Sequence, residues 1–113
     1  MDPNIRIDML YQIYGTFLTA KQQDMIVAHY YEDLSLTEIG ENLEISKQAV
    51  SNQLNRAVHK MEHMESVLGV LHFRSRAERL FPVWEELLRQ DGRPEAAEVR
   101  SFLEELHSKA DSE

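Results

Sequence analysis

The sequence contains no cysteine, which excludes disulfide bonds and a zinc site built on thiolates. It has no signal peptide and no apolar run long enough to span a membrane, so we expect a soluble, cytoplasmic protein with no membrane partner. A glycine-rich phosphate loop, a thiol nucleophile and a defensible Ser-His-Asp arrangement are also absent. We therefore expect a protein that is not an enzyme and binds no cofactor.

Basic residues are scarce as well. The chain has 12 lysine and arginine residues against 20 acidic ones, for a net charge of -8. Nucleic-acid-binding proteins usually carry a basic surface, and the chain as a whole lacks one. Residues 46–60 are the exception, because Lys47, Arg56 and Lys60 occur there without any acidic residue. Three cations release few counterions, so a single copy should bind nucleic acid weakly and lose affinity steeply with salt.

Glycine and proline are few, and no segment alternates apolar and polar residues as a half-buried strand does. The sequence therefore predicts an all-α fold. Apolar residues at three- and four-residue spacing indicate an N-terminal amphipathic helix: Ile5, Met9, Leu10, Ile13, Tyr14, Phe17 and Leu18. Residues 19–22, Thr-Ala-Lys-Gln, form a capping box that opens a second helix, which should end near Tyr31.

Residues 35–60 carry the pattern of a helix-turn-helix. Residues 35–38, Ser-Leu-Thr-Glu, form another capping box, and Gly40 in the helix that follows allows a close approach. Residues 44–46 make the turn, and Ser46 is the N-cap of a helix that starts at Lys47. Two capped helices joined by a turn of about three residues suit a recognition helix held against a support helix.

The recognition helix has an apolar and a polar side. At about 100° per residue, Leu54, Ala57 and Met61 fall on the side of Val50. The opposite side holds only amides, a guanidinium and an imidazole, from Gln48, Asn52, Asn55, Arg56 and His59. Asparagine and glutamine suit the edge of adenine, and arginine suits guanine or phosphate. Lys47, in the first turn, is better placed for a phosphate. The alternative is that this row is an ordinary solvated face.

The recognition helix should continue beyond Lys60. Apolar residues follow it at alternating four- and three-residue spacing, a heptad seam of about three repeats: Val50, Leu54, Ala57, Met61, Met64, Leu68 and Leu71. In one interpretation, the first half of the seam closes the helix-turn-helix core and the second half packs on the C-terminal helices. In the other, a helix of about 30 Å reaches about Leu68, and its distal half forms a homodimer. Both can hold at once.

Residues 69–113 are expected to form a C-terminal helical extension of two helices, after a helix-turn-helix domain of residues 1–68. Pro82 should kink the first helix or begin a new segment, and residues 91–94, Asp-Gly-Arg-Pro, should separate the two. The last helix should be short, with a frayed polar tail over residues 108–113. The apolar surface of the extension suggests an oligomer or partner surface, although core packing accounts for any one residue equally well. The extension would either pack on the first domain or form the dimer surface.

His59 and His63 are four residues apart and share a helix face, as in a two-histidine metal pair. No third ligand is evident, and the residues between them do not match the zinc-protease pattern. We therefore expect solvent-facing histidines and no metal site.

Three segments together resemble a known family. They are Leu18-Thr19 with Gln22, residues 35–39 (Ser-Leu-Thr-Glu-Ile) and residues 45–50 (Ile-Ser-Lys-Gln-Ala-Val). With the two-helix extension, they resemble the YlxM-like family of small bacterial helix-turn-helix proteins. The resemblance covers nearly the whole chain, is dense from Tyr11 to Lys60 and becomes loose after Gly69. Residues 35–60 are also similar to region 4 of sigma-70 factors, which grips promoter duplex through such a helix.

The resemblance implies a sigma-region-4-like all-α fold, a homodimer and a role in the signal recognition particle pathway, since members tend to be encoded beside that particle's GTPase subunit. Carried over residue by residue, the sigma-like motif places nucleic-acid contacts at Lys47, Gln48, Ser51, Asn52, Asn55 and Arg56. Ser51 and Asn52 stand where sigma factors usually have a basic residue and an amide, which argues against promoter-type affinity.

Two functional hypotheses remain. The first is a regulatory protein that inserts its recognition helix into the major groove of duplex DNA, with two copies spaced by a dimer. Signal recognition particle RNA would instead be bound through loops or backbone, because the A-form major groove is too narrow for a helix. The second is an acidic adaptor that docks on a basic protein, such as the particle's GTPase. The net charge favours the second hypothesis, and the polar row favours the first.

Overall fold

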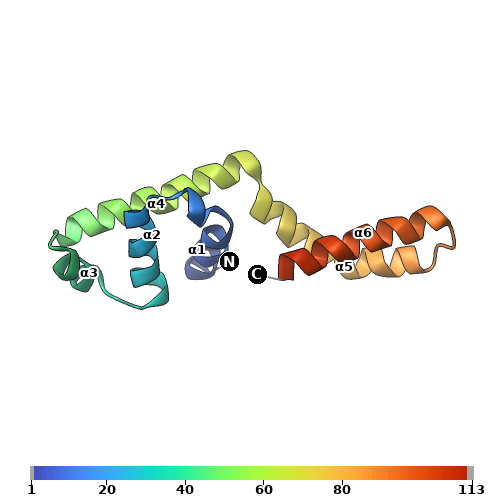
Figure 1. The fold of residues 1–113 in the computed structure, drawn as a ribbon, viewed down its shortest axis with the longest axis horizontal. Coiled ribbons are helices and arrows are strands. Elements are labelled where there is room, and N and C mark those ends of the chain that lie inside the picture. Colours follow the sequence, from blue (N-terminus) through green and yellow to red (C-terminus); the bar gives the residue numbers. More distant parts are fainter. Residues whose placement is uncertain (1, 112–113) are drawn as a thin grey trace. The chain divides into compact units, whose positions relative to one another are not determined.

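The computed structural model describes residues 2–111, and all the regular secondary structure in them is helical (Figure 1). The helices are α1 (Pro3–Tyr14), α2 (Ala20–Ile26), α3 (Leu36–Leu43), α4 (Lys47–Leu68), α5 (Val70–Arg89) and α6 (Pro94–Asp111), with a 3-10 turn η1 (Gly15–Phe17) and a π-helical turn η2 (Val27–Tyr31). The predicted all-α fold is confirmed. None of the described helices has the length and apolar character needed to cross a membrane.

The chain forms two compact units: unit 1 ends at Leu71, and unit 2 begins at His72. In unit 1, α4 is the central helix, and α1, α2 and α3 pack against it (Figure 1). The side of α4 predicted to be apolar is buried, since Val50, Leu54, Ala57 and Met61 are at most 4% exposed. They pack with a cluster from the other elements, namely Leu10, Tyr14, Leu18, Met25, Ile26, Ile39 and Leu71. Burying one aliphatic side chain contributes about 1.5–3 kcal/mol, so rotation of α4 about its axis would be costly.

The heptad seam is used mainly inside unit 1. The recognition helix does run from Lys47 to Leu68, as one interpretation held. However, Met64 packs half-buried on the unit 1 core, and Leu71 is 6% exposed, whereas Leu68 is 58% exposed. The distal half of α4 also contacts α1, because Glu62 and Glu65 accept hydrogen bonds from Arg6 and Tyr14.

A buried glutamate anchors the distal end of α4. The Glu65 carboxylate accepts hydrogen bonds from the Tyr14 hydroxyl of α1 at 2.7 Å and from the Leu71 backbone N–H at 2.9 Å. Burial and the hydrogen bond to Glu65 raise the pKa of Tyr14. Near it on α4, Glu62 accepts a 2.6 Å bond from Arg6 of α1, which raises the pKa of Arg6 and lowers that of Glu62. This second pair is about 40% exposed, so it contributes at most about 1 kcal/mol.

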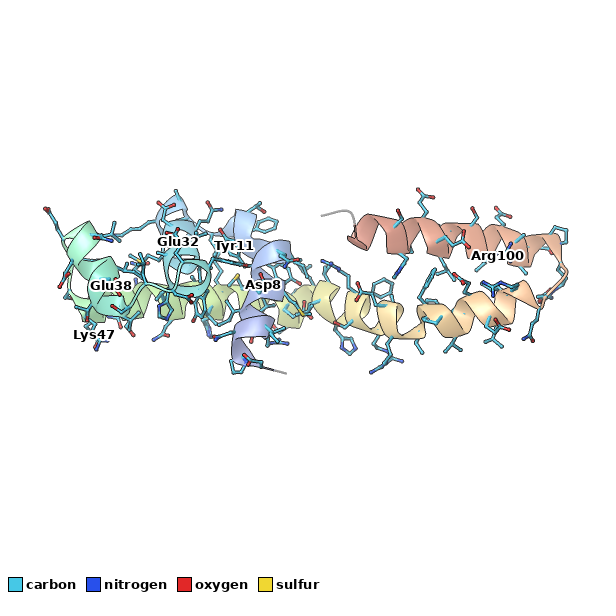
Figure 2. All side chains as sticks on the ribbon, turned by 90° about the horizontal axis from the view of Figure 1, so that it is seen from below. Asp8, Tyr11, Glu32, Glu38, Lys47 and Arg100 are labelled. Atoms are coloured by element: carbon cyan, nitrogen blue, oxygen red, sulfur yellow. The ribbon has the colours of Figure 1, made fainter. Side chains whose placement is uncertain are left out.

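Unit 2 is a hairpin in which α5 and α6 lie side by side (Figures 1 and 2). The rings of Phe81 and His107 stack between the two helices, with centroids 4.3 Å apart. The predicted stop and restart at residues 91–94 is confirmed, because α5 ends at Arg89 and α6 begins at Pro94. In the connection, hydrogen bonds from the side chain and backbone of Arg93 lower the pKa of Asp91 to about 2.

The structure bears on two further predictions for unit 2. Of the two outcomes predicted for Pro82, a kink or a new segment, the second is wrong, because Pro82 lies inside α5. It is exposed, so water can bond to the carbonyl that loses its donor, and the helix continues. The last helix is not short, because α6 reaches Asp111 and includes the start of the tail that was predicted to fray. The stacking of His107 on Phe81 gives this end of α6 a partner. The remainder of the predicted tail lies outside the described residues.

The anchor at Glu65 gives a stability prediction. We expect Glu65→Ala to lower the free energy of unfolding by about 2–4 kcal/mol, because it leaves a buried hydroxyl and a buried N–H without their acceptor. Glu65→Gln keeps a carbonyl oxygen and should lose less. Urea denaturation followed by far-UV circular dichroism measures both. Glu41→Ala removes an exposed glutamate of the same unit and is the control. A loss for Glu65→Ala no larger than that of the control would rule out the anchor.

Candidate nucleic-acid interface

Both caps predicted for the helix-turn-helix are present. The Ser35 hydroxyl accepts a 3.0 Å hydrogen bond from the Glu38 N–H, and the Glu38 carboxylate accepts a 3.1 Å bond from the Ser35 N–H. At the start of α4, the Ser46 hydroxyl accepts a 3.0 Å bond from the Ala49 N–H. These bonds satisfy backbone donors that would otherwise be unpaired. They fix the residues at which α3 and α4 begin.

The turn between α3 and α4 depends on a close approach at Gly40. The Ile45 N–H donates to the Gly40 carbonyl at 2.9 Å, which folds the chain back over the end of α3. A Cβ atom at Gly40 would lie 2.7 Å from the Ile45 carbonyl oxygen, closer than real contacts allow. Glu44 takes the left-handed conformation, with φ of 59°, at the end of α3. The glycine predicted to allow a close approach therefore does so against the turn that leads into α4.

Most of the predicted contact residues lie on the exposed side of α4. Five of the six are exposed: Lys47, Gln48, Asn52, Asn55 and Arg56. Ser51 is half-buried, because its position borders the side of the helix that holds Val50. The Gln48 side-chain amide donates a 3.0 Å hydrogen bond to the Asn52 side-chain oxygen, which links two of the predicted base-reading groups. Lys47 lies at the end of unit 1 that also carries Glu38 (Figure 2).

The exposed side of α4 carries the local positive charge. Neither Lys47 nor Arg56 forms an ion pair with the side chains described, those of residues 2–108. The Lys60 ammonium donates to the Phe17 carbonyl oxygen at 2.7 Å, which ties it to η1. The acidic residues that border this stretch in sequence are Glu44 and Glu62. The cations of this stretch are therefore few, and Lys47 and Arg56 lie about half a turn apart around the axis of α4.

The exposed row continues past Arg56 along α4. An open hollow of about 700 Å³ is lined by Asn55, Arg56, His59, Lys60 and His63, all from this helix. Among the side chains of residues 2–108, no three from histidine or acidic residues lie close enough together to hold a metal ion. The hollow is lined by an amide, basic groups and imidazoles, which suit an anion better than a cation.

Comparison with known proteins shows which family has this architecture. Residues 1–98 match the model of the family UPF0122, described as "Putative helix-turn-helix protein, YlxM / p13 like". The chain belongs to this family. A UPF0122 protein of Listeria innocua is 33% identical over 101 residues, covering 89% of this chain and 91% of that protein. One of Bacillus licheniformis is 31% identical over 106 residues, covering 94% and 97%. One of Geobacillus kaustophilus is 37% identical over 71 residues, covering 63% and 64%.

The predicted family resemblance is thus confirmed for this UPF0122 protein. Sequence reasoning missed the polar contacts that hold its recognition helix from outside the helix-turn-helix. Arg6 and Glu62 are 56 residues apart, and Lys60 contacts a carbonyl 43 residues earlier. Such pairs leave no local pattern in a single sequence. The sequence does contain a weak signal for the buried Glu65. This acidic residue directly follows Met64, within the part of α4 that carries the apolar heptad seam.

The close approach at Gly40 gives a second stability prediction. We expect Gly40→Ala to lower the free energy of unfolding by about 1–3 kcal/mol, because the added methyl group forces the turn away from α3. Chemical denaturation of the full chain measures the change. Gly92→Ala is the matched control, since nothing lies within 4 Å of the Cβ that it adds. If the two variants were equally stable, the turn would have room for a side chain, contrary to the structure.

Proposed function

We propose that this protein is a regulatory protein that binds nucleic acid through α4. The observation that carries the proposal is the face of α4 opposite the core. It presents exposed amides and cations, without an acidic residue between Ser46 and Met61, on a helix whose rotation is fixed by packing. This is where a helix-turn-helix places the side chains that contact bases. Membership of a helix-turn-helix family supports the same function.

Each side chain has a role that suits its chemistry. Gln48, Asn52 and Asn55 can both donate to and accept from a base edge, as adenine requires. The hydrogen bond between Gln48 and Asn52 holds two of these amides in place and leaves other donors and acceptors for bases. Arg56 suits guanine or a phosphate, and Lys47 suits a phosphate beside the first turn. Ser51, half-buried at the edge of the face, would contact only the backbone.

We propose further that the protein acts as a homodimer, because one copy supplies few cations and two copies double that number. Unit 2 offers the surface for it. Large apolar side chains of the hairpin are exposed, namely Phe73, Val83, Leu87, Val99, Phe102 and Leu106. A chain of about 40 residues rarely buries enough surface to be stable by itself, and two such hairpins can complete a four-helix bundle. Unit 2 would then set the spacing between two recognition helices.

On the basis of the family resemblance, we propose further that the protein acts in the signal recognition particle pathway, in the cytoplasm. Under that proposal, the RNA of the particle is a second candidate ligand besides duplex DNA. The major groove of an A-form helix excludes α4, so an RNA would be bound through loops or through its backbone.

A second candidate function is that of an adaptor without nucleic-acid binding. The net charge of -8 and the exposed apolar side chains of unit 2 favour it. An acidic protein of this kind would dock on a basic partner, such as the GTPase of the signal recognition particle. In that case the polar side of α4 would be a solvated surface.

A set of substitutions separates the two functions. We expect the triple variant Gln48→Ala/Asn52→Ala/Arg56→Ala to lose duplex DNA affinity by about 100-fold or more, since each base contact contributes about 1–3 kcal/mol. The assay is fluorescence anisotropy with a mixed-sequence duplex at low and near-physiological salt, with signal recognition particle RNA as competitor. Saturable binding should weaken steeply with salt.

The matched control is Ser75→Ala/Arg76→Ala/Gln90→Ala, which removes the same number of cations from exposed positions of unit 2. It should bind DNA as the unmodified protein does. Competition by the RNA would favour a role with the particle. Absence of duplex binding even at low salt would exclude the recognition-helix function and favour the adaptor.

A further inference from the structure

The recognition helix is longer than a major groove can use. With 22 residues, α4 is about 33 Å long, whereas the groove is about 12 Å wide. Residues near the N-terminus of a recognition helix contact bases, and the far end of such a helix can lie against the backbone. From Asn52 to His63 the helix advances about 16 Å. Side chains near His63 would therefore meet phosphates, and base edges would be out of reach.

The hollow on α4 has the composition that phosphates require. Its guanidinium, ammonium and two imidazoles follow one another on the exposed side of the helix, at Arg56, Lys60, His59 and His63. Lys60 is held at the edge by its bond to the Phe17 carbonyl, which occupies only one of its three donors. The imidazoles are exposed, so they are accessible to a ligand.

The surrounding charges do not cancel this composition. All five lining residues come from α4, so no charged side chain of α1, α2 or α3 lines the hollow within the described residues. Glu62 follows in sequence, but its carboxylate is bound by the Arg6 guanidinium of α1 at 2.6 Å. Glu65, the next acid on α4, faces the core, where it bonds to Tyr14.

We propose that this hollow is a phosphate-binding site in which His59 and His63 make nucleic-acid binding strengthen as the pH falls. The duplex part of the proposal rests on the proposed function, in which α4 faces nucleic acid. Histidine is the side chain that ordinarily changes charge between about pH 5 and pH 8. Protonation of both imidazoles would add two positive charges to this face of α4. Each phosphate contact releases about 0.9 counterions, so the salt dependence should steepen at low pH.

The first test measures duplex binding against pH. With a fluorescein-labelled, mixed-sequence DNA duplex, we expect the apparent Kd of the full chain to fall roughly tenfold from pH 8.0 to about pH 5.8 as two charged contacts are added. In His59→Gln/His63→Gln this gain should vanish. The control His72→Gln replaces an exposed histidine of α5 and should keep the gain. An equal gain in the double variant and the control would overturn the proposal.

A second test does not depend on duplex binding. Inorganic pyrophosphate is titrated into the full chain at about pH 6, and the imidazole resonances are followed by NMR. Saturable shifts for His59 and His63, larger than that of His72, would establish the phosphate site even if no duplex bound, in which case only the proposed function would fail. Unchanged resonances of His59 and His63 would overturn the site, whether or not the duplex binds through Gln48, Asn52 and Arg56.

Discussion

The burial of one side of α4 is the constraint on which unit 1 depends. Val50, Leu54, Ala57 and Met61 fill the core between α4 and the three helices that cross it, so α4 is both the main core element and the candidate interface. Because side chains on a helix repeat every 3.6 residues, fixing one side inward fixes the other outward. The packing of the core therefore also orients the exposed amides and cations, without further contacts. Any substitution that loosens the core would also make the position of the interface side chains less well defined.

The far end of α4 is held by polar contacts. Tyr14 and Arg6, both on α1, reach Glu65 and Glu62. The N-terminal end is held differently, by the Ser46 cap and by the close approach of Gly40 to Ile45. These two kinds of restraint act at opposite ends of α4. The polar face between them therefore belongs to a rigid segment, which favours accurate placement against a regular ligand such as a duplex.

Local patterns predicted the elements well. The capping boxes at Thr19 and Ser35 and the cap at Ser46 are all present, and they could be predicted because these bonds join residues only three positions apart. The heptad spacing leaves two interpretations of α4 open, because it does not say which neighbour covers the apolar seam. Long-range contacts such as Lys60 with Phe17 could not be predicted from one sequence. Pro82 inside α5 shows that an exposed proline need not end a helix that packs through its other side. The six predicted contact residues share α4, but what they bind remains a proposal.

The acidic surroundings of the cationic face of α4 carry a kinetic consequence. Unit 1, which ends at Leu71, holds five basic and ten acidic side chains. Three of the basic ones lie between Ser46 and Met61. A polyanion approaching any other part of this unit meets net repulsion. Encounters in wrong orientations should therefore be short-lived, and the charge pattern acts as a filter on orientation before any contact is made. Salt screens the repulsion from the acidic parts of unit 1 and the attraction to α4 alike. The preference for the correct orientation of approach and the affinity should therefore decline together.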